Sequence, residues 1–184
     1  MQNQKIRQMT TAALLCALAI VIPMFSPVKI IIEPASFTLA SHVAIMVAMF
    51  ISPKMGASVN VGATLGFLLG GFPPVVVARA ASQLIFVVIG GYLISKHPEY
   101  LEKRNKMLIF MVVIGLIHAG GEILAVLPFY ISSNPSGWLN NLFILVGVGT
   151  LIHSCVDFML AKAVWVVLEK RIKKPAYQTN PAQV

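Results

Sequence analysis

The chain of 184 residues is 58% hydrophobic and only 11% charged, with a formal net charge of +8. This composition excludes an ordinary soluble domain and indicates a polytopic membrane protein. The charge does not indicate nucleic-acid binding, because the basic residues gather before the first apolar run, in every second connection and after the last run: Lys5 and Arg7; Lys54; Lys96, Lys103, Arg104 and Lys106; Lys170, Arg171, Lys173 and Lys174. The positive-inside rule then predicts that both termini lie in the cytoplasm.

Six apolar runs predict an all-α membrane domain over residues 1–174 with six transmembrane helices. The runs are Met9–Phe25, Thr38–Ser52, Lys54–Leu69, Val75–Ser95, Met107–Phe129 and Trp138–Leu168. The polar tail, residues 175–184, is predicted to be a disordered cytoplasmic extension.

Small residues mark one face of the first predicted helix. Ala13 and Ala17 form an A-x-x-x-A step, and small residues four apart let another helix approach closely in lipid. The step predicts either contact with a partner helix or packing inside the bundle. The next segment, Ser26–Phe37, is amphipathic and too short to span again, so we expect an outer loop on or over the bundle.

Two ionisable residues interrupt the fifth predicted helix. His118 and Glu122 stand one turn apart in the apolar run Met107–Phe129. A charged group at the centre of such a helix costs at least ~2.5–3.5 kcal/mol on insertion scales. The pair therefore marks a binding site, a relay or a buried partner.

Depth along the helices predicts a polar cluster in the outer half of the bundle. Arg79 and Gln83 share one face of the fourth helix, about 6 Å and about 12 Å below its outer end at 1.5 Å per residue. A cation, a carboxylate, amides and imidazoles beside aromatic rings predict a site for a small polar aromatic ligand, with Phe37 and Tyr130 nearby. The candidate ligand-binding residues are Arg79, Gln83, Glu122, His118, Asn141, His42 and Trp138.

Two His-x-x-x-carboxylate pairs, His118/Glu122 and His153/Asp157, have the ligand types that a divalent ion accepts. The fifth and sixth helices run antiparallel, so both histidines fall near the midplane, with Glu122 about 6 Å outward and Asp157 about 6 Å inward. One compact site cannot easily use both carboxylates, so no resident metal ion is predicted. We expect Asp157 to pair with Lys162 or to serve as a structural partner.

No sequence motif supports catalysis. The chain has no H-E-x-x-H, G-x-S-x-G or G-x-x-x-x-G-K-[ST] pattern, so it is not predicted to be an enzyme or to cradle nucleotide phosphates. No cofactor is expected. If the chain moves a solute uphill using ATP, a partner must supply the hydrolysis.

The chain resembles the S components of energy-coupling factor (ECF) vitamin transporters over Lys5–Lys174. The resemblance rests on six predicted helices, both termini inside, the A-x-x-x-A step and a long first outer loop. EPASFTLASHVAIMVAMFISPKMGA and GFLLGGFPP are most similar to the subgroup for small heteroaromatic rings, whose candidates are niacin, pyridoxine and hydroxymethylpyrimidine. An outer Arg79 favours niacin, a carboxylate, over the two neutral alcohols.

This resemblance implies a multi-pass protein of a bacterial cell membrane that captures a vitamin on the outside. It would dock through Ala13 and Ala17 onto a transmembrane coupling subunit driven by two cytoplasmic ATPase subunits, then topple in the membrane to release its load. The family's site is formed by the first loop and the outer parts of helices four to six.

Several alternatives stay open. The ligand is pyridoxine or hydroxymethylpyrimidine; or the chain is a divalent-cation S component or channel with His118 or His153 as a metal ligand. A third alternative is a structural or assembly membrane protein without a ligand, whose buried polar residues satisfy one another. If Arg79 is ion-paired with Glu122, the case for an anionic ligand weakens.

Overall fold

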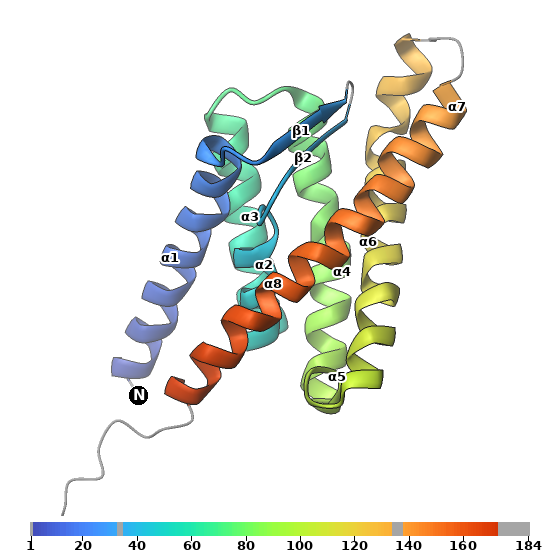
Figure 1. Ribbon diagram of the computed structural model, residues 1–184. Helices are drawn as coiled ribbons and strands as arrows, with labels where there is room; N and C mark the ends of the chain where they lie inside the picture. The colour runs from blue at the N-terminus through green and yellow to red at the C-terminus, as the bar shows by residue number, and fades with distance from the viewer. Residues whose placement is uncertain (1, 33–34, 134–137, 173–184) are drawn as a thin grey trace, which may run out of the picture.

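The computed structural model describes residues 2–32, 35–133 and 138–172, which form a helical bundle with one short hairpin at one end (Figure 1). The predicted tail 175–184 lies outside the described residues. The elements in chain order are α1 (Gln2–Phe25), β1 (Lys29–Ile32), β2 (Ala35–Thr38), α2 (Val43–Ile51), α3 (Pro53–Leu69), α4 (Pro74–Lys96), α5 (Glu99–Glu102), α6 (Arg104–Ser133), α7 (Trp138–Asn140), the π-helix η1 (Asn141–Val148) and α8 (Gly149–Ile172).

Four helical segments among the described residues are long and apolar enough to cross a membrane: Lys5–Phe25, Pro74–Lys96, Arg104–Ile131 and Trp138–Glu169. The last one combines α7, η1 and α8, so the predicted sixth helix changes its winding along its length. The chain is thus a multi-pass, mainly helical membrane protein. The helices α2 and α3 are shorter, with 9 and 17 residues.

The prediction of a membrane helix over Thr38–Ser52 is wrong in its bounds. Thr38 ends β2, and α2 begins only at Val43. A nine-residue helix is about 14 Å long, whereas the hydrocarbon core is about 30 Å thick. Residues 44–50 are all buried, so α2 lies inside the bundle, as expected for a helix that is apolar on every side.

A serine and a proline separate α2 from α3. Pro53 stands at the first position of α3, where its missing N–H costs nothing. The hydroxyl of Ser52 accepts a hydrogen bond of 3.1 Å from the Met55 N–H and so caps the new helix. These two residues turn one apolar run into two helices.

The segment Ser26–Phe37, predicted as a loop, contains most of an antiparallel hairpin. Lys29 pairs with Thr38 and Ile32 pairs with Ala35. The hairpin lies at the end of the bundle away from α5 (Figure 1). It thus covers one end of the bundle, where the polar cluster was predicted.

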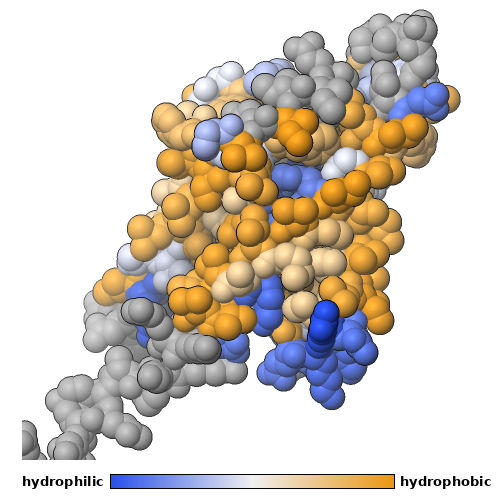
Figure 2. Space-filling model, viewed as in Figure 1, coloured by the Kyte–Doolittle hydropathy of each residue, from blue (hydrophilic) through white to orange (hydrophobic). Residues whose placement is uncertain are grey.

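The surface matches a membrane environment. Apolar side chains such as Leu69, Ile109 and Leu124 are exposed on the outside, and hydrophobic residues cover most of the visible side of the bundle (Figure 2). Hydrophilic residues gather around α5, at the end where α1 begins and α8 ends (Figures 1 and 2). The first and last long helices therefore have their terminal ends on the same side.

Glycines allow α4 to approach the start of α3. A Cβ atom placed on Gly91 would lie 2.7 Å from the Cα atom of Pro53, too close for any rotation to relieve. On α3, Gly62 and Gly66 face the side chains of Cys16 and Ile20 of α1, so a Cβ atom there would meet side-chain and not backbone atoms. Gly62, Gly66 and Gly91 are therefore packing residues.

Replacing Gly91 with alanine should lower the free energy of unfolding by about 1–3 kcal/mol, because the backbone of Pro53 must move. The measurement is the melting temperature of the purified protein in detergent. Gly120→Ala is the matched control, since a Cβ atom there meets no atom within 4 Å and alanine favours helix. Equal melting temperatures for the two variants would contradict this packing.

Candidate functional site

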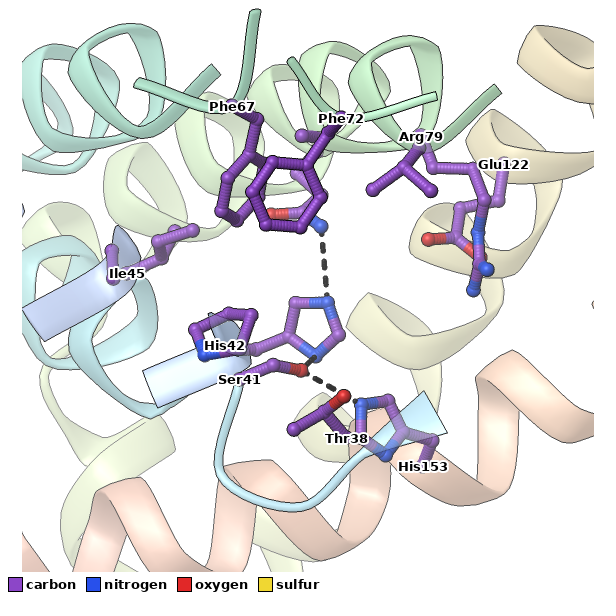
Figure 3. A pocket seen from close by; sticks show the side chains of 14 residues that line it. Thr38, Ser41, His42, Ile45, Phe67, Phe72, Arg79, Glu122 and His153 are labelled. Carbon is purple, nitrogen blue, oxygen red and sulfur yellow. Dashed lines mark hydrogen bonds and ion pairs between the residues drawn. The ribbon is translucent and has the colours of Figure 1, made fainter. Parts of the chain in front are cut away.

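A cavity of about 300 Å³ lies under the hairpin, between α1, α2, α3, α4, α6 and α8. Apolar side chains form one part of its wall and polar side chains the other, as is usual for small-molecule sites. The polar residues are Thr38, Ser41, His42, Arg79, Gln83, Glu122 and His153; the apolar ones are Ala19, Pro23, Ile45, Phe67, Phe72, Val76 and Ala80. Figure 3 shows the ring of His42 between Phe67 and Phe72 on one side and Ser41, Thr38 and His153 on the other.

The carboxylate of Asp157 positions the turn between β2 and α2. It accepts hydrogen bonds from the backbone N–H groups of Ala40, at 2.8 Å, and His42, at 2.9 Å. Ala40 has a φ of 66°, an uncommon conformation for a residue with a Cβ atom. Asp157 itself is fully buried, so these donors replace the water that its charge has lost.

His42, which immediately precedes α2, joins two sides of this network. Its Nδ1 atom lies 3.0 Å from Asp157 Oδ2, and its Nε2 atom lies 3.0 Å from the side-chain nitrogen of Gln83. A carboxylate only accepts, so Nδ1 carries the proton and Nε2 accepts from the amide. The rings of His118 and His153 meet the His42 ring edge to face, with centroids at 4.7 and 4.8 Å.

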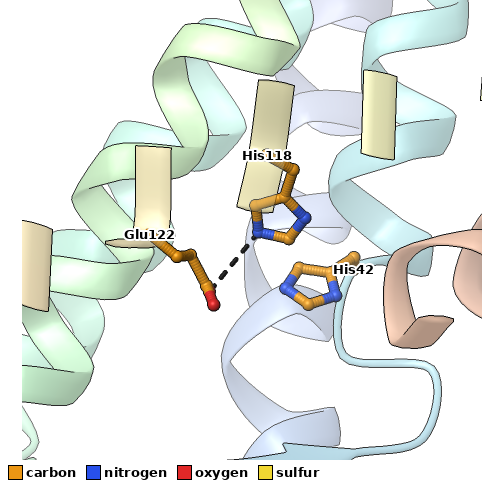
Figure 4. A group of neighbouring side chains, drawn as sticks. All are labelled: His42, His118 and Glu122. Carbon is orange, nitrogen blue, oxygen red and sulfur yellow. Dashed lines mark ion pairs between the residues drawn. The ribbon is translucent and has the colours of Figure 1, made fainter. Parts of the chain in front are cut away.

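Glu122 ties three helices together. Its Oε2 atom lies 3.0 Å from Nη2 of Arg79 on α4 and accepts a 2.5 Å hydrogen bond from the Thr150 hydroxyl on α8. Its Oε1 atom lies 3.4 Å from Nε2 of His118, one turn away on α6 (Figure 4). A charge that is costly inside a membrane thus has a cation, a hydroxyl and an imidazole around it.

Phe37, on strand β2 of the hairpin, contacts two members of the network. Its ring lies 5.4 Å from the guanidinium carbon of Arg79, within the range of a cation–π contact, and 5.6 Å from the His153 ring. A Cβ atom on Gly149 would lie 2.7 Å from this ring. The glycine at the start of α8 therefore makes room for Phe37.

The structure brings together most of the predicted ligand-binding residues. Four of them line the cavity: His42, Arg79, Gln83 and Glu122. His118 does not line it, but its ring contacts the ring of His42. Trp138 does not line the cavity.

Trp138 instead packs against a separate cluster of Val126, Tyr130, Leu142 and Val146. Tryptophan fluorescence from this position is therefore a weak probe of the cavity. The side chain of Asn141 lies outside the described part, so its predicted role stays a prediction.

The expected pairing of Asp157 with Lys162 is wrong. Among the described residues, the partners of Asp157 are the N–H groups of Ala40 and His42 and the rings of His42 and His153. Lys162 lies at another cavity, beside Glu102 and Trp165. The position of Asp157 along one helix does not reveal the turn between β2 and α2 that reaches it.

Sequence reasoning also missed Thr38, Ser41 and His153 as cavity residues. The Ser41 hydroxyl lies 3.1 Å from Nε2 of His153, so these residues form one wall. The four-residue spacing of His153 and Asp157 was the available signal.

Two groups of three side chains, His42/His118/Glu122 and His42/His153/Asp157, have donor atoms within 4.8 Å of one another. In each group the atoms already face a hydrogen-bond or ion-pair partner, and Arg79 beside Glu122 opposes a further cation. The network holds together through its own hydrogen bonds. The absence of a resident metal ion stays a prediction.

The predicted docking residues lie on the opposite face of α1 from the cavity. Ala13 and Ala17 are exposed, whereas Ala19 is buried and lines the cavity. At 100° per residue, Ala17 and Ala19 point in nearly opposite directions. One helix therefore presents small residues outward and a cavity wall inward.

A family model described as "ECF-type riboflavin transporter, S component" matches residues 3–174. The chain belongs to this S-component family. It is 44% identical to "Niacin transporter NiaX" of Lactococcus lactis subsp. cremoris (strain MG1363) over 172 residues, which are 92% of this chain and 78% of the relative. No solved structure matches the chain. The resemblance to ECF S components is thus confirmed, and the chain is a transport protein of a family that is not one of enzymes.

Replacing Asp157 with asparagine should lower the free energy of unfolding by about 1–3 kcal/mol, because the new NH₂ group would face one of two buried backbone N–H groups. The melting temperature in detergent measures this. Glu102→Gln makes the same chemical change on the exposed surface and should leave the melting temperature unchanged. An equally stable Asp157→Asn protein would show that the carboxylate does not hold the turn.

Proposed function

We propose that this chain is the substrate-capture subunit of an ECF-type importer for niacin (nicotinic acid). The observation that carries the proposal is the 44% identity to the niacin transporter over 92% of the chain. The cavity supports it, because about 300 Å³ is at the small end for ligand sites and suits a single-ring vitamin. Aromatic walls from Phe67 and Phe72 suit the faces of such a ring.

The ion pair between Arg79 and Glu122 changes the argument for niacin. The sequence favoured an anion because Arg79 was expected to meet the ligand. The guanidinium lies 3.0 Å from a carboxylate of the protein, which weakens that argument. The preference for niacin therefore rests on the relative, with Arg79 as a cavity residue whose charge is shared.

We further propose six crossings of the membrane, with both termini in the cytoplasm. The basic residues around α5 and at the start of α1 support an inner location for that end. The hairpin and the cavity then face the outside, where an importer meets its substrate. In this arrangement α3 makes one crossing within the bundle, and β2, the turn after it and α2 together make up another.

The energy for transport would come from partners, namely a transmembrane coupling subunit and two ATPase subunits. The exposed Ala13 and Ala17 offer a face on which a partner helix can approach closely. The largely exposed α1 supports this role, since few of its residues pack inside the bundle.

Three other functions differ in what they bind. Pyridoxine and hydroxymethylpyrimidine fit the same small cavity and carry no carboxylate. A divalent-cation S component is favoured by the two groups of donors that share His42. A structural protein without a ligand is favoured by the many polar contacts within the network.

Calorimetric titration of the purified protein with niacin, pyridoxine, hydroxymethylpyrimidine and divalent nickel, cobalt and zinc separates these functions. We expect saturable binding of niacin alone. Arg79→Ala should weaken niacin binding about tenfold to hundredfold, because a hydrogen bond to a charged group is worth about 1.5–3 kcal/mol.

Two variants control the titration. Arg104→Ala removes an exposed arginine and should bind niacin normally. The double variant Arg79→Ala/Glu122→Gln removes both charges, so that a folding defect from an unpaired Glu122 does not mimic a binding defect. Full niacin affinity in both Arg79 variants would remove Arg79 from the site, and binding of another compound in place of niacin would replace the proposed ligand.

Replacing Ala13 and Ala17 together with leucine should abolish niacin uptake by cells that make the complete importer, because the larger side chains keep the partner helix away. The niacin affinity of the isolated protein should stay the same, since neither residue lines the cavity. Ala163→Leu, at an exposed position on α8, is the control. Normal uptake by the double variant would move the docking face elsewhere.

A further inference from the structure

The buried network around the cavity contains one more carboxylate than guanidinium groups among the described residues, although the proposed ligand is an anion. Among the described residues, two buried carboxylates, Glu122 and Asp157, belong to the network, and one guanidinium, that of Arg79, balances them. Bringing a carboxylate from water into such a site costs free energy unless a positive charge comes with it.

The groups that surround His42 restrict which side chain can carry this positive charge. The titratable or charged side chains around it are Arg79 on α4, His118 and Glu122 on α6, and His153 and Asp157 on α8. The cavity residues of α1 and of the α3 end, Ala19, Pro23, Phe67 and Phe72, carry no charge. His42 alone among the three imidazoles lies 3.0 Å from a carboxylate on one side and 3.0 Å from an amide on the other.

Among the described residues, the side-chain oxygen of Gln83 accepts no hydrogen bond. The side-chain nitrogen of Gln83 faces His42. The side chain is only 7% exposed and lines the cavity. A buried carbonyl oxygen without a partner costs about 1–3 kcal/mol, and a carboxylate ligand cannot supply the missing donor.

We infer that the site takes up one proton together with the niacin anion, and that His42 holds this proton at Nε2. The inference rests on the proposed function, since it concerns the charge of the bound vitamin. The proton comes from bulk water and adds to the lone pair of Nε2, which in the neutral ring accepts from Gln83. His42 then donates from both nitrogens, to Asp157 through Nδ1 and toward Gln83 through Nε2.

Protonation of His42 also reverses the polarity of the cavity wall. A rotation of the Gln83 amide by half a turn places its oxygen against the new N–H, so the previously unpartnered acceptor is used. Its NH₂ group then faces the cavity as a donor for the carboxylate of the vitamin, beside the hydroxyls of Ser41 and Thr38. One proton thus supplies the positive charge. It also lets the Gln83 amide present a hydrogen-bond donor to the cavity in place of an acceptor.

The test is calorimetric titration of the full-length protein with niacin in buffers of different ionisation enthalpy. The observed enthalpy should change with the buffer in proportion to about one proton taken up per niacin. The niacin affinity should fall by up to about tenfold for each unit of pH increase, as linkage requires for one proton. Niacin binding with no proton exchange and no pH dependence would overturn the inference and leave the proposed function intact.

Variants locate the proton. His42→Asn keeps a donor toward Asp157, and His42→Gln keeps a polar group toward Gln83; in both, proton uptake should disappear and niacin should bind at least about tenfold more weakly. His97→Gln, at an exposed histidine, should take up the proton as the unchanged protein does. Uptake that persists in both His42 variants would place the proton on another group and overturn the inference.

Gln83→Met tests the amide. It removes both the acceptor for His42 and the donor for the vitamin, so niacin affinity should fall by about tenfold or more. Unchanged affinity and unchanged proton uptake in this variant would overturn the role of Gln83. A folded protein that gives no heat with niacin in any buffer would overturn the proposed function and, with it, this inference.

Discussion

The cost of keeping Glu122 and Asp157 inside an apolar bundle determines how the elements around the cavity are arranged. A carboxylate in a membrane interior is tolerated when donors and cations replace its lost water. Asp157 obtains this from the turn before α2, and Glu122 obtains it from α4, α6 and α8. The hairpin, the start of α2 and three long helices are therefore held together by two charges.

Several of these interactions occur in the wall of the cavity, so the residues that hold the bundle together include those proposed to bind the ligand. His42 bonds to Asp157 and also lines the cavity; Arg79 pairs with Glu122 and lines it as well. A ligand that enters competes with, or adds to, bonds that the protein already makes. In the proposed function, the net charge and the donors of the ligand then matter as much as its shape, and the hydrogen-bonding state of Gln83 is part of the proposed recognition.

The helix α1 presents different residues on its two faces. Ala19 and Pro23 form part of the cavity wall, while Ala13 and Ala17 are exposed on the other side. Glycines of α3 face α1, so the two helices approach closely there. A partner that displaces α1 would therefore change the cavity directly, without a long chain of contacts.

The sequence by itself determined the membrane character, the positions of most of the long helices and the identity of most of the polar cavity residues. These features depend on local properties: apolar run length, charge in the connections, and residues four apart on one helix face. The sequence also showed that His118/Glu122 and His153/Asp157 stand one helical turn apart within apolar runs. Family membership followed from the same patterns.

Only the tertiary structure decided which groups bond to which. The hairpin within Ser26–Thr38 brings His42 between the two carboxylates, and Asp157 therefore bonds to the turn and not to Lys162. Whether Arg79 faces a ligand or Glu122 depends on the rotation of α4 relative to α6. Trp138 is predicted at the site but packs against the cluster that contains Val126, Tyr130, Leu142 and Val146. Hydrogen bonds depend on differences of less than an ångström between helices far apart in the chain, and no local pattern specifies these.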